Sequence, residues 1–309
     1  MSNDGLSSFL SYLLSGLSYC FSIPFFYIVV FKSPPFIRVY RNTILNLGIW
    51  YCVTMASYSI LFQPAYTKFS TKSCARFMGL VSYFGVNVNI IVIFLAVICV
   101  ENTVVAKFIC FLYRYAQMRR ANRANFLKSW KGLLICVAMH ITVSILSGCL
   151  SYVFLINGEI IEENGTFLLC ADEHNYNIVK RLTLIVLIVF ISQSAAIAAF
   201  AFMTIRCLSS LKTHMTKRTY KLNQLLTINL VVLLIFPIVF HDVPICILCC
   251  MIYIKSDSMY FWVSFTGHAP FGELILTFST ILWFVTPYRE AVKAMLWKKS
   301  VVVPNSNVT

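Results

Sequence analysis

Long apolar stretches alternate with short polar and basic segments along almost the whole chain. Each stretch holds about 20 residues or more, the length that an α-helix needs to cross the hydrocarbon core of a bilayer. Seven spanning helices are therefore predicted, at residues 9–31, 42–62, 76–102, 132–156, 182–207, 224–254 and 261–286. The predicted fold class is an all-α membrane protein, a seven-transmembrane helix bundle.

The segment after the seventh stretch has a different pattern. Residues 287–299 place an aromatic anchor, Trp297, beside cations, which predicts a short amphipathic helix on the membrane surface. Residues 300–309 are expected to be a disordered tail. Residues 1–299 are thus expected to form one membrane domain.

The third stretch indicates the direction of the helices in the membrane. Its apolar run, Met78 to Val100, is followed by a cluster of cations that includes Arg114, Arg119 and Arg120. Lys and Arg in short loops are retained on the cytoplasmic side. Of the 25 Lys and Arg residues, 19 fall in segments on one side of the predicted bundle and 6 on the other. The N-terminus is therefore expected outside and the C-terminus in the cytoplasm.

The composition agrees with a membrane protein and argues against a nucleic-acid partner. The chain is 59% hydrophobic and 12% charged, whereas soluble domains have about 25% charged residues. The net charge of +14 comes from cations in short loops between apolar spans. Membrane orientation and contact with anionic lipid explain cations in such loops, so membrane lipid is the expected partner and nucleic acid is not.

Two of the twelve cysteines are expected to pair. Most cysteines lie inside apolar runs, where they are expected to be small buried hydrophobes. Cys74 and Cys170 both lie on the predicted outer side, where disulfides form and persist, so a Cys74–Cys170 bond is predicted. Asn164, in Asn164-Gly165-Thr166, meets the rule for N-glycosylation and lies in the same outer loop.

Four ionisable residues lie inside the predicted sixth and seventh spans. They are His241, Asp242, His268 and Glu273. Charge within the bilayer is costly, so such residues are either ligand or ion contacts or members of a hydrogen-bond cluster that holds helices in register. Both interpretations stay open. His140, alone in the fourth span, is expected to be structural.

Pro237 and Pro244 are expected to bend the sixth span. Each removes a backbone hydrogen bond from the helix. A bent helix with a basic inner end can swing outward as a lever. A static bend that widens a cavity is the alternative.

Several kinds of chemistry have no signal in the sequence. The chain contains no Gly-rich phosphate loop, no HExxH and no GxSxG motif, so an enzyme is not expected. Cys246, Cys249 and Cys250 have no histidine at zinc-ligand spacing, so no metal site is predicted. The seventh span contains no lysine that could carry a retinal Schiff base. No cofactor is therefore predicted.

The topology and several short motifs resemble a G-protein-coupled receptor. More narrowly, the chain is similar to the nematode serpentine chemoreceptors, the superfamily that contains the Str, Srh, Sri and Srd groups. The motifs are spread over most of the chain: Ile23-Pro24, Lys32-Ser33-Pro34, Pro237, Pro244, His268 and Pro287-Tyr288-Arg289. Ala269 replaces the glycine that usually follows the histidine, and the seventh span lacks an NPxxY pattern.

The inner end of the third span departs from the receptor pattern, because no arginine closely follows Glu101-Asn102. From Cys74 to Glu101 is 27 residues, about 40 Å of helix, a plausible crossing. From Cys74 to Arg114 is 40 residues, about 60 Å, too long for one crossing. Glu101 is therefore expected at the inner end of the span.

The resemblance implies a chemosensory receptor in the plasma membrane of a sensory-neuron cilium. A small odorant or pheromone would bind His241, Asp242, His268 and Glu273, and a heterotrimeric G protein would bind the inner side; a receptor oligomer stays open. The residues expected to couple to the G protein are Glu101, Asn102, Arg114, Arg119, Arg120, Lys217, Arg218 and Lys221. A seven-span transporter and a ligand-gated channel subunit are the alternatives.

Overall fold

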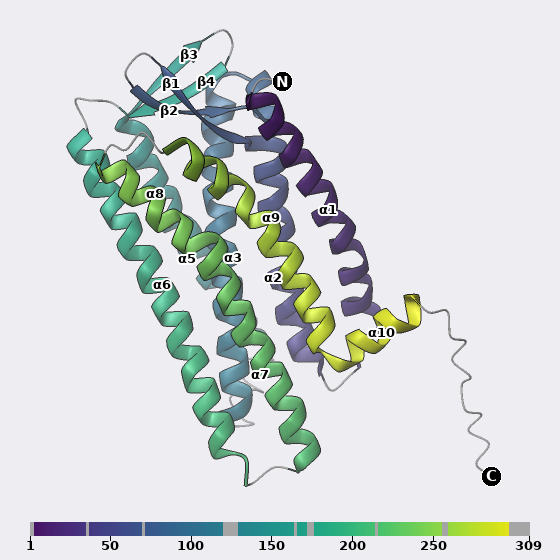
Figure 1. Ribbon diagram of the computed structural model, residues 1–309. Coiled ribbons are helices and arrows are strands. Elements are labelled where there is room, and N and C mark those ends of the chain that lie inside the picture. Colours follow the sequence, from purple (N-terminus) through teal and green to yellow (C-terminus); the bar gives the residue numbers. More distant parts are fainter. Residues whose placement is uncertain are drawn as a thin grey trace, which may run out of the picture.

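The structure is a computed structural model that describes residues 3–34, 37–69, 72–119, 129–163, 166–171, 176–213, 216–254 and 259–296. Its long helices follow the order of the predicted spans (Figure 1). They are α1 (Asn3–Phe31), α2 (Arg38–Ala56), α3 (Val86–Arg119), α5 (Trp130–Ile156), α6 (Tyr176–Ser210), α7 (Lys217–Pro237), α8 (Val243–Ile254) and α9 (Met259–Phe284), with a short α10 (Thr286–Leu296) at the end.

Length and composition of these helices agree with a seven-span protein. Within the described ranges, six helices are long and apolar enough to cross a membrane unaided, and α9 with α10 makes a seventh as one bent pair. The two members of that pair meet at 97°. α10 therefore turns across the end of the bundle (Figure 1), and it occupies most of the range in which the sequence predicts an amphipathic helix. The predicted seven-helix bundle is confirmed.

A small β-sheet, which the all-α prediction omits, covers one end of the bundle. Its strands are β1 (Pro64–Phe69), β2 (Lys72–Phe77), β3 (Gly158–Glu163) and β4 (Thr166–Ala171). They are antiparallel neighbours in the order β1-β2-β4-β3, so two hairpins from distant loops join edge to edge. The sheet lies near the N-terminus in Figure 1. We call this the sheet end, and the opposite end, where α9 meets α10, the tail end.

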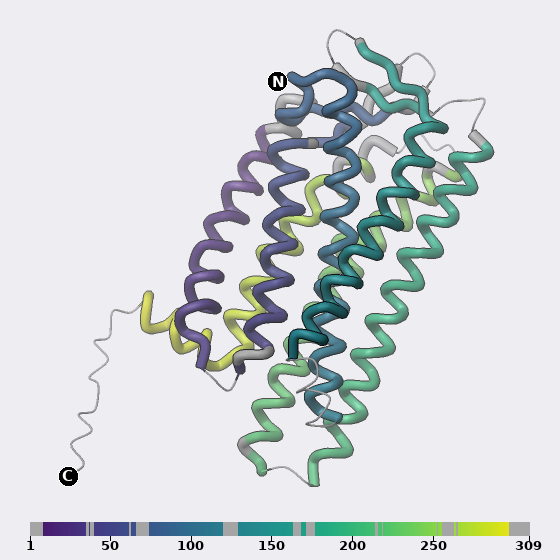
Figure 2. The backbone as a smooth tube through the Cα atoms, turned by 180° about the vertical axis from the view of Figure 1, so that it is seen from behind, coloured from purple at the N-terminus to yellow at the C-terminus, as the bar shows by residue number. Residues whose placement is uncertain are grey.

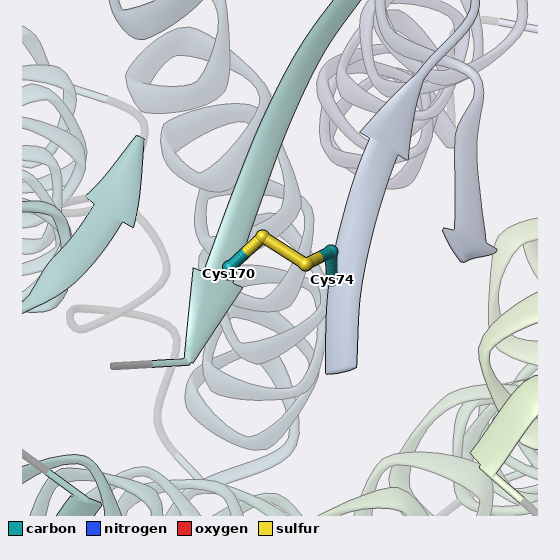
Figure 3. The surroundings of a disulfide bond; sticks show 2 residues. All are labelled: Cys74 and Cys170. Carbon is teal, nitrogen blue, oxygen red and sulfur yellow. A yellow bond between two sulfur atoms is a disulfide. The ribbon is translucent and has the colours of Figure 1, made fainter. Parts of the chain in front are cut away.

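The predicted disulfide joins the two hairpins. Cys74 on β2 faces Cys170 on β4 directly in the strand register, and their sulfur atoms are bonded (Figure 3). Both side chains are buried together with Leu168. The bond therefore fixes the loop between α5 and α6 to the loop between α2 and α3. Asn164 lies outside the described residues.

The third span differs from its predicted range. The helix was expected at residues 76–102 but runs from Val86 to Arg119. Cys74 lies on a strand, and a 3-10 turn (Leu80–Tyr83) separates that strand from the helix. The apolar run that begins near Met78 is therefore not helical throughout, and the helix extends much further toward the tail end.

The sixth span is interrupted between its two prolines. α7 ends at Pro237, a π-helical turn η4 (Ile238–Asp242) follows, and α8 begins at Val243, with Pro244 in its first turn. A proline lacks the N–H that would continue the regular ladder, and π-turns accommodate such a break. Another π-turn, η2 (Ser57–Phe62), ends the second span.

The largest hydrophobic core joins α1, α2, α3, α6, α7 and α9 toward the tail end. At its centre Phe25 of α1 and Phe278 of α9 stack with ring centroids 3.9 Å apart. α5 contributes no residue to this core and packs mainly against α3. Figure 2, seen from behind, shows α5 along the outside of the bundle. Its apolar outer face is the kind of surface that lipid covers.

Candidate functional site

A buried ion pair connects the third and seventh spans. Lys107 Nζ of α3 lies 2.6 Å from Glu273 Oε1 of α9, and the two side chains are 8% and 3% exposed. Tyr51 of α2 donates a hydrogen bond to the same carboxylate oxygen. The Lys107 ammonium also lies over the Tyr51 ring, 5.2 Å from its centroid. Side chains from two other helices thus contact the Glu273 carboxylate. A charge that is buried in a bilayer has to be paired in this way.

A second polar group forms where the sixth span is broken. Asp242 is the last residue of the π-turn η4 and accepts a hydrogen bond from Ser194 of α6. His241 Nδ1 donates to the other Asp242 oxygen at 3.3 Å. The ring of Phe190, also on α6, packs edge-on to His241. The break in the sixth span is therefore held to α6 by side-chain contacts.

A small cavity lies between these two polar groups. It has a volume of about 20 Å³, enough for one water molecule. Its polar lining comes from Lys107, Gln193, Ser194 and Asp242. The remaining lining is apolar and comes from Val104, Phe111, Ile197, Leu233, Leu234 and Pro237. Because pockets for small organic ligands have volumes of about 300 Å³ or more, binding one here requires the helices to separate.

The four predicted ligand residues do not form one cluster. His241 and Asp242 face α6, Glu273 faces α2 and α3, and His268 is hydrogen bonded to Ser11 of α1 at 3.0 Å. The sequence placed the four side chains in two adjacent spans, but that alone does not place them on the same side of their helices. The cavity brings Asp242 together with Lys107, which the sequence analysis had counted among the loop cations.

Lys107 is the functional residue that sequence reasoning missed. It was assigned to the inner loop because the third span was expected to end at residue 102. In the structure it lies 21 residues into a 34-residue helix. One signal could have found it: Glu273 is a carboxylate within a predicted span, and such a group needs a cation at the same depth.

Glu101 and Asn102 lie in the middle of α3, so their predicted place at the inner end is wrong. Glu101 accepts a hydrogen bond from Gln193 of α6 at 3.0 Å. Asn102 donates to Ser144 of α5 at 2.9 Å and accepts from His140 Nδ1 at 2.6 Å. The error has a simple cause, since the helix length was measured from Cys74, which is not in the helix.

Arg114 lies closer than Glu101 to the tail end of α3. From Val86 to Arg114 is 28 residues, about 42 Å of helix, a distance that spans the hydrocarbon core. The Arg114 side chain is buried, and its guanidinium donates to the backbone oxygen of Asn223 at 2.8 Å and to Asn223 Oδ1 at 3.0 Å. The arginine therefore connects α3 to α7 at the tail end.

The other predicted coupling residues lie around the same end. Arg119 is exposed and donates to Tyr115 at 2.6 Å, and Lys217 and Lys221 are exposed on the first turns of α7. The backbone of Arg218 belongs to the same helix. Arg120 lies outside the described residues.

Seven membrane-crossing helices, with a charged contact buried among them, define a serpentine membrane protein. The model of one receptor family, the serpentine type 7TM GPCR chemoreceptor Srh, matches residues 2–298. The chain belongs to this family, a group of multi-pass membrane chemoreceptors. No match was found among curated proteins. The predicted resemblance to the nematode serpentine chemoreceptors is confirmed.

Proposed function

We propose that the chain is a chemosensory receptor that binds a small odorant or pheromone from the extracellular side and signals through a heterotrimeric G protein. It is no enzyme, and it acts in the plasma membrane, in the cilium of a sensory neuron. The sheet end lies outside the cell and the tail end lies in the cytosol. The distribution of cations supports this orientation, because removal of Lys107 from the inner count leaves 18 of the remaining 24 in the segments predicted to be cytoplasmic.

The observation that carries the proposal is the position of the cavity at the break in the sixth span. Pro237, where α7 ends, and Asp242, where η4 ends, both line the cavity. A ligand that enlarges the cavity therefore acts on residues at both ends of the π-turn η4. We propose that Pro237 and Pro244 together form the hinge about which α7 moves.

The contact between Arg114 and Asn223 supplies the second part of the mechanism. It joins the inner end of α7 to α3 by hydrogen bonds from a charged donor, which contribute about 1.5–3 kcal/mol each. Movement of α7 about the hinge breaks this contact and exposes the inner ends of α3 and α7. The G protein then binds there, near Lys217 and Lys221.

The ligand acts by shifting an equilibrium between these two forms. It can do so only to the extent that it binds one form better than the other. The described structure has a cavity with room for one water molecule, and Arg114 is hydrogen bonded to Asn223. It therefore corresponds to the form that the ligand disfavours.

A cell-based assay tests the proposal. Cells that express the receptor, with and without a co-expressed G protein, are exposed to a panel of volatile and water-soluble cues, and cAMP and calcium are recorded. We expect a response that requires both the receptor and the G protein. A response that persists without the G protein indicates a channel, and uptake of labelled cue indicates a transporter; either result refutes the proposal.

A further inference from the structure

Carboxyl groups outnumber lysines around the Lys107–Glu273 pair and the break in the sixth span. Among the described residues in this region are three carboxyl groups, those of Glu101, Asp242 and Glu273, and a single lysine, Lys107. His241 contacts Asp242 and adds at most one positive charge. The three carboxyl groups thus share one lysine and one histidine.

The Lys107 ammonium is already paired with one of the three carboxyl groups. Glu273 Oε1 lies 2.6 Å from Lys107 Nζ and also accepts a hydrogen bond from Tyr51. Glu101 has a neutral donor, Gln193, at 3.0 Å, and Asp242 has the hydroxyl of Ser194 together with His241. A buried carboxylate is best compensated by a cation and by hydrogen bonds together. Glu101 and Asp242 are therefore held by neutral donors and by His241, while Lys107, which also lines the cavity, is bonded to Glu273.

The cavity opens on the side of this cluster that faces α6. Of its polar lining groups, Gln193 Oε1 is buried and has no hydrogen-bond partner among the described residues, while Gln193 Nε2 is held by Glu101. Asp242 lines the same cavity and has acceptor capacity beyond its two donors. The cavity thus presents a free acceptor and a carboxylate to whatever enters it.

We propose that this cavity is a site for a small primary amine in its protonated form, with a short apolar tail. The ammonium lies between Asp242 and Gln193 Oε1 and donates hydrogen bonds to both. The tail lies against the apolar lining, which includes Ile197 and Leu233. This inference rests on the proposed receptor function only in naming the class of cue, because amine binding by itself requires no signalling.

The same geometry argues against other ligand classes. A carboxylate would reach Lys107 but would lie beside the Asp242 carboxylate, and it would have to displace Glu273. A neutral alcohol could donate only one hydrogen bond to the two acceptors. A protonated amine has several N–H donors, enough for both Asp242 and Gln193 Oε1, and a positive charge for Asp242.

The small size of the cavity links amine binding to movement of the sixth span. The cavity of about 20 Å³ has room for an ammonium group but not for an alkyl tail. The tail must separate α7 from α3 and α6, and Pro237 lies in the wall that moves. Amines with a tail of several carbons are therefore expected to bind the moved form, whereas ammonium itself is expected to leave α7 in place.

Binding to the purified receptor in lipid nanodiscs tests this inference without a G protein. n-Butylamine, n-butanol and butyrate share a chain length and differ in their polar group. We expect n-butylamine alone to raise the thermal unfolding midpoint of the wild-type receptor. Equal stabilisation by n-butanol or butyrate, or none by n-butylamine, overturns the inference whatever the variants do.

Variants then locate the site. Asp242→Asn and Gln193→Leu are each expected to weaken n-butylamine binding roughly 10- to 100-fold, whereas Asp242→Glu keeps the charge and most of the affinity. Glu290→Gln removes an acidic charge from an exposed position on α10 and is expected to change nothing. Unchanged affinity in both Asp242→Asn and Gln193→Leu places the amine elsewhere and refutes the assignment.

The outcome separates this inference from the proposed function. A receptor that binds n-butylamine but activates no G protein keeps the amine site and contradicts the signalling proposal. A receptor that signals to other cues and ignores amines keeps the signalling proposal and removes the amine site.

Discussion

The ion pair between Lys107 and Glu273 gives the sharpest prediction. At 2.6 Å and an effective dielectric constant of about 20, the attraction between two unit charges is roughly 6 kcal/mol, offset by the desolvation of both groups. Removal of one partner leaves the other charged and buried, which costs about 3–5 kcal/mol. We therefore expect Lys107→Met and Glu273→Gln each to destabilise the receptor by about this amount.

The double variant distinguishes a true pair from two independent side chains. Once both charges are gone no buried charge lacks a partner, so the double variant should be less destabilised than the sum of the two single variants by about 2–3 kcal/mol. Unfolding free energies in mixed micelles, with SDS as denaturant, provide the measurement. Additive effects within about 0.5 kcal/mol refute the pairing.

The ligand response of Glu273→Gln gives an independent test of its role. If Glu273 acts only through Lys107 and the helix contacts, the variant loses stability or surface expression and keeps the potency of the cue in the receptors that reach the surface. An altered potency at normal surface expression shows that the carboxylate also influences the ligand site.

Three further predictions concern other contacts. Cys170→Ser removes a bond that closes a loop of 96 residues, worth about 4–5 kcal/mol, so we expect the receptor to be retained inside the cell, and normal surface labelling would contradict this. Arg114→Met removes the contact to α7, so we expect higher cAMP or calcium signalling without ligand, whereas Arg181→Met, at an exposed position on α6 near the sheet end, should leave the basal signal unchanged. Tyr51→Phe removes one hydrogen bond to a carboxylate and should cost about 1.5–3 kcal/mol in the same micelle assay; a cost near zero would show that Lys107 alone satisfies Glu273.

The sequence was sufficient to predict the number and order of the helices, because lipid imposes a minimum length on every apolar span. It was not sufficient for the start of α3. The apolar run from Met78 to Val100 has no polar residue to mark where strand and turn end and helix begins. The helix begins only at Val86, so every depth counted from Cys74 was too great.

The sheet was missed for a related reason. Its four strands are six residues long each and lie in two loops about ninety residues apart in the chain. A six-residue strand has little periodicity of its own, and the pairing of β2 with β4 is a long-range contact that local patterns do not encode. The cysteines carried the one usable signal, since Cys74 and Cys170 proved to be directly opposite residues of neighbouring strands.

Polar contacts between helices are distributed around α3. At least one side-chain hydrogen bond or ion pair joins α3 to each of five neighbouring helices. The pairs are Thr103 with Thr54 of α2, Asn102 with Ser144 of α5, Glu101 with Gln193 of α6, Arg114 with Asn223 of α7, and Lys107 with Glu273 of α9. The uncharged bonds among them contribute about 0.6–2 kcal/mol each within a bilayer. α3 is therefore the helix against which the others are positioned.

The contacts of the sixth span differ on the two sides of its break. Toward the tail end, α7 is held by Arg114 through Asn223 and by Tyr40 of α2, which accepts a hydrogen bond from Asn229 at 2.6 Å. On the other side of Pro237, Asp242 is held to α6. Bending at the π-turn can therefore release both tail-end contacts while the contact of Asp242 stays in place. On the proposed mechanism, a ligand beside Asp242 has to overcome those two contacts and the packing of α7 in the core, and the tail end of α7, rather than the whole span, is the part that moves.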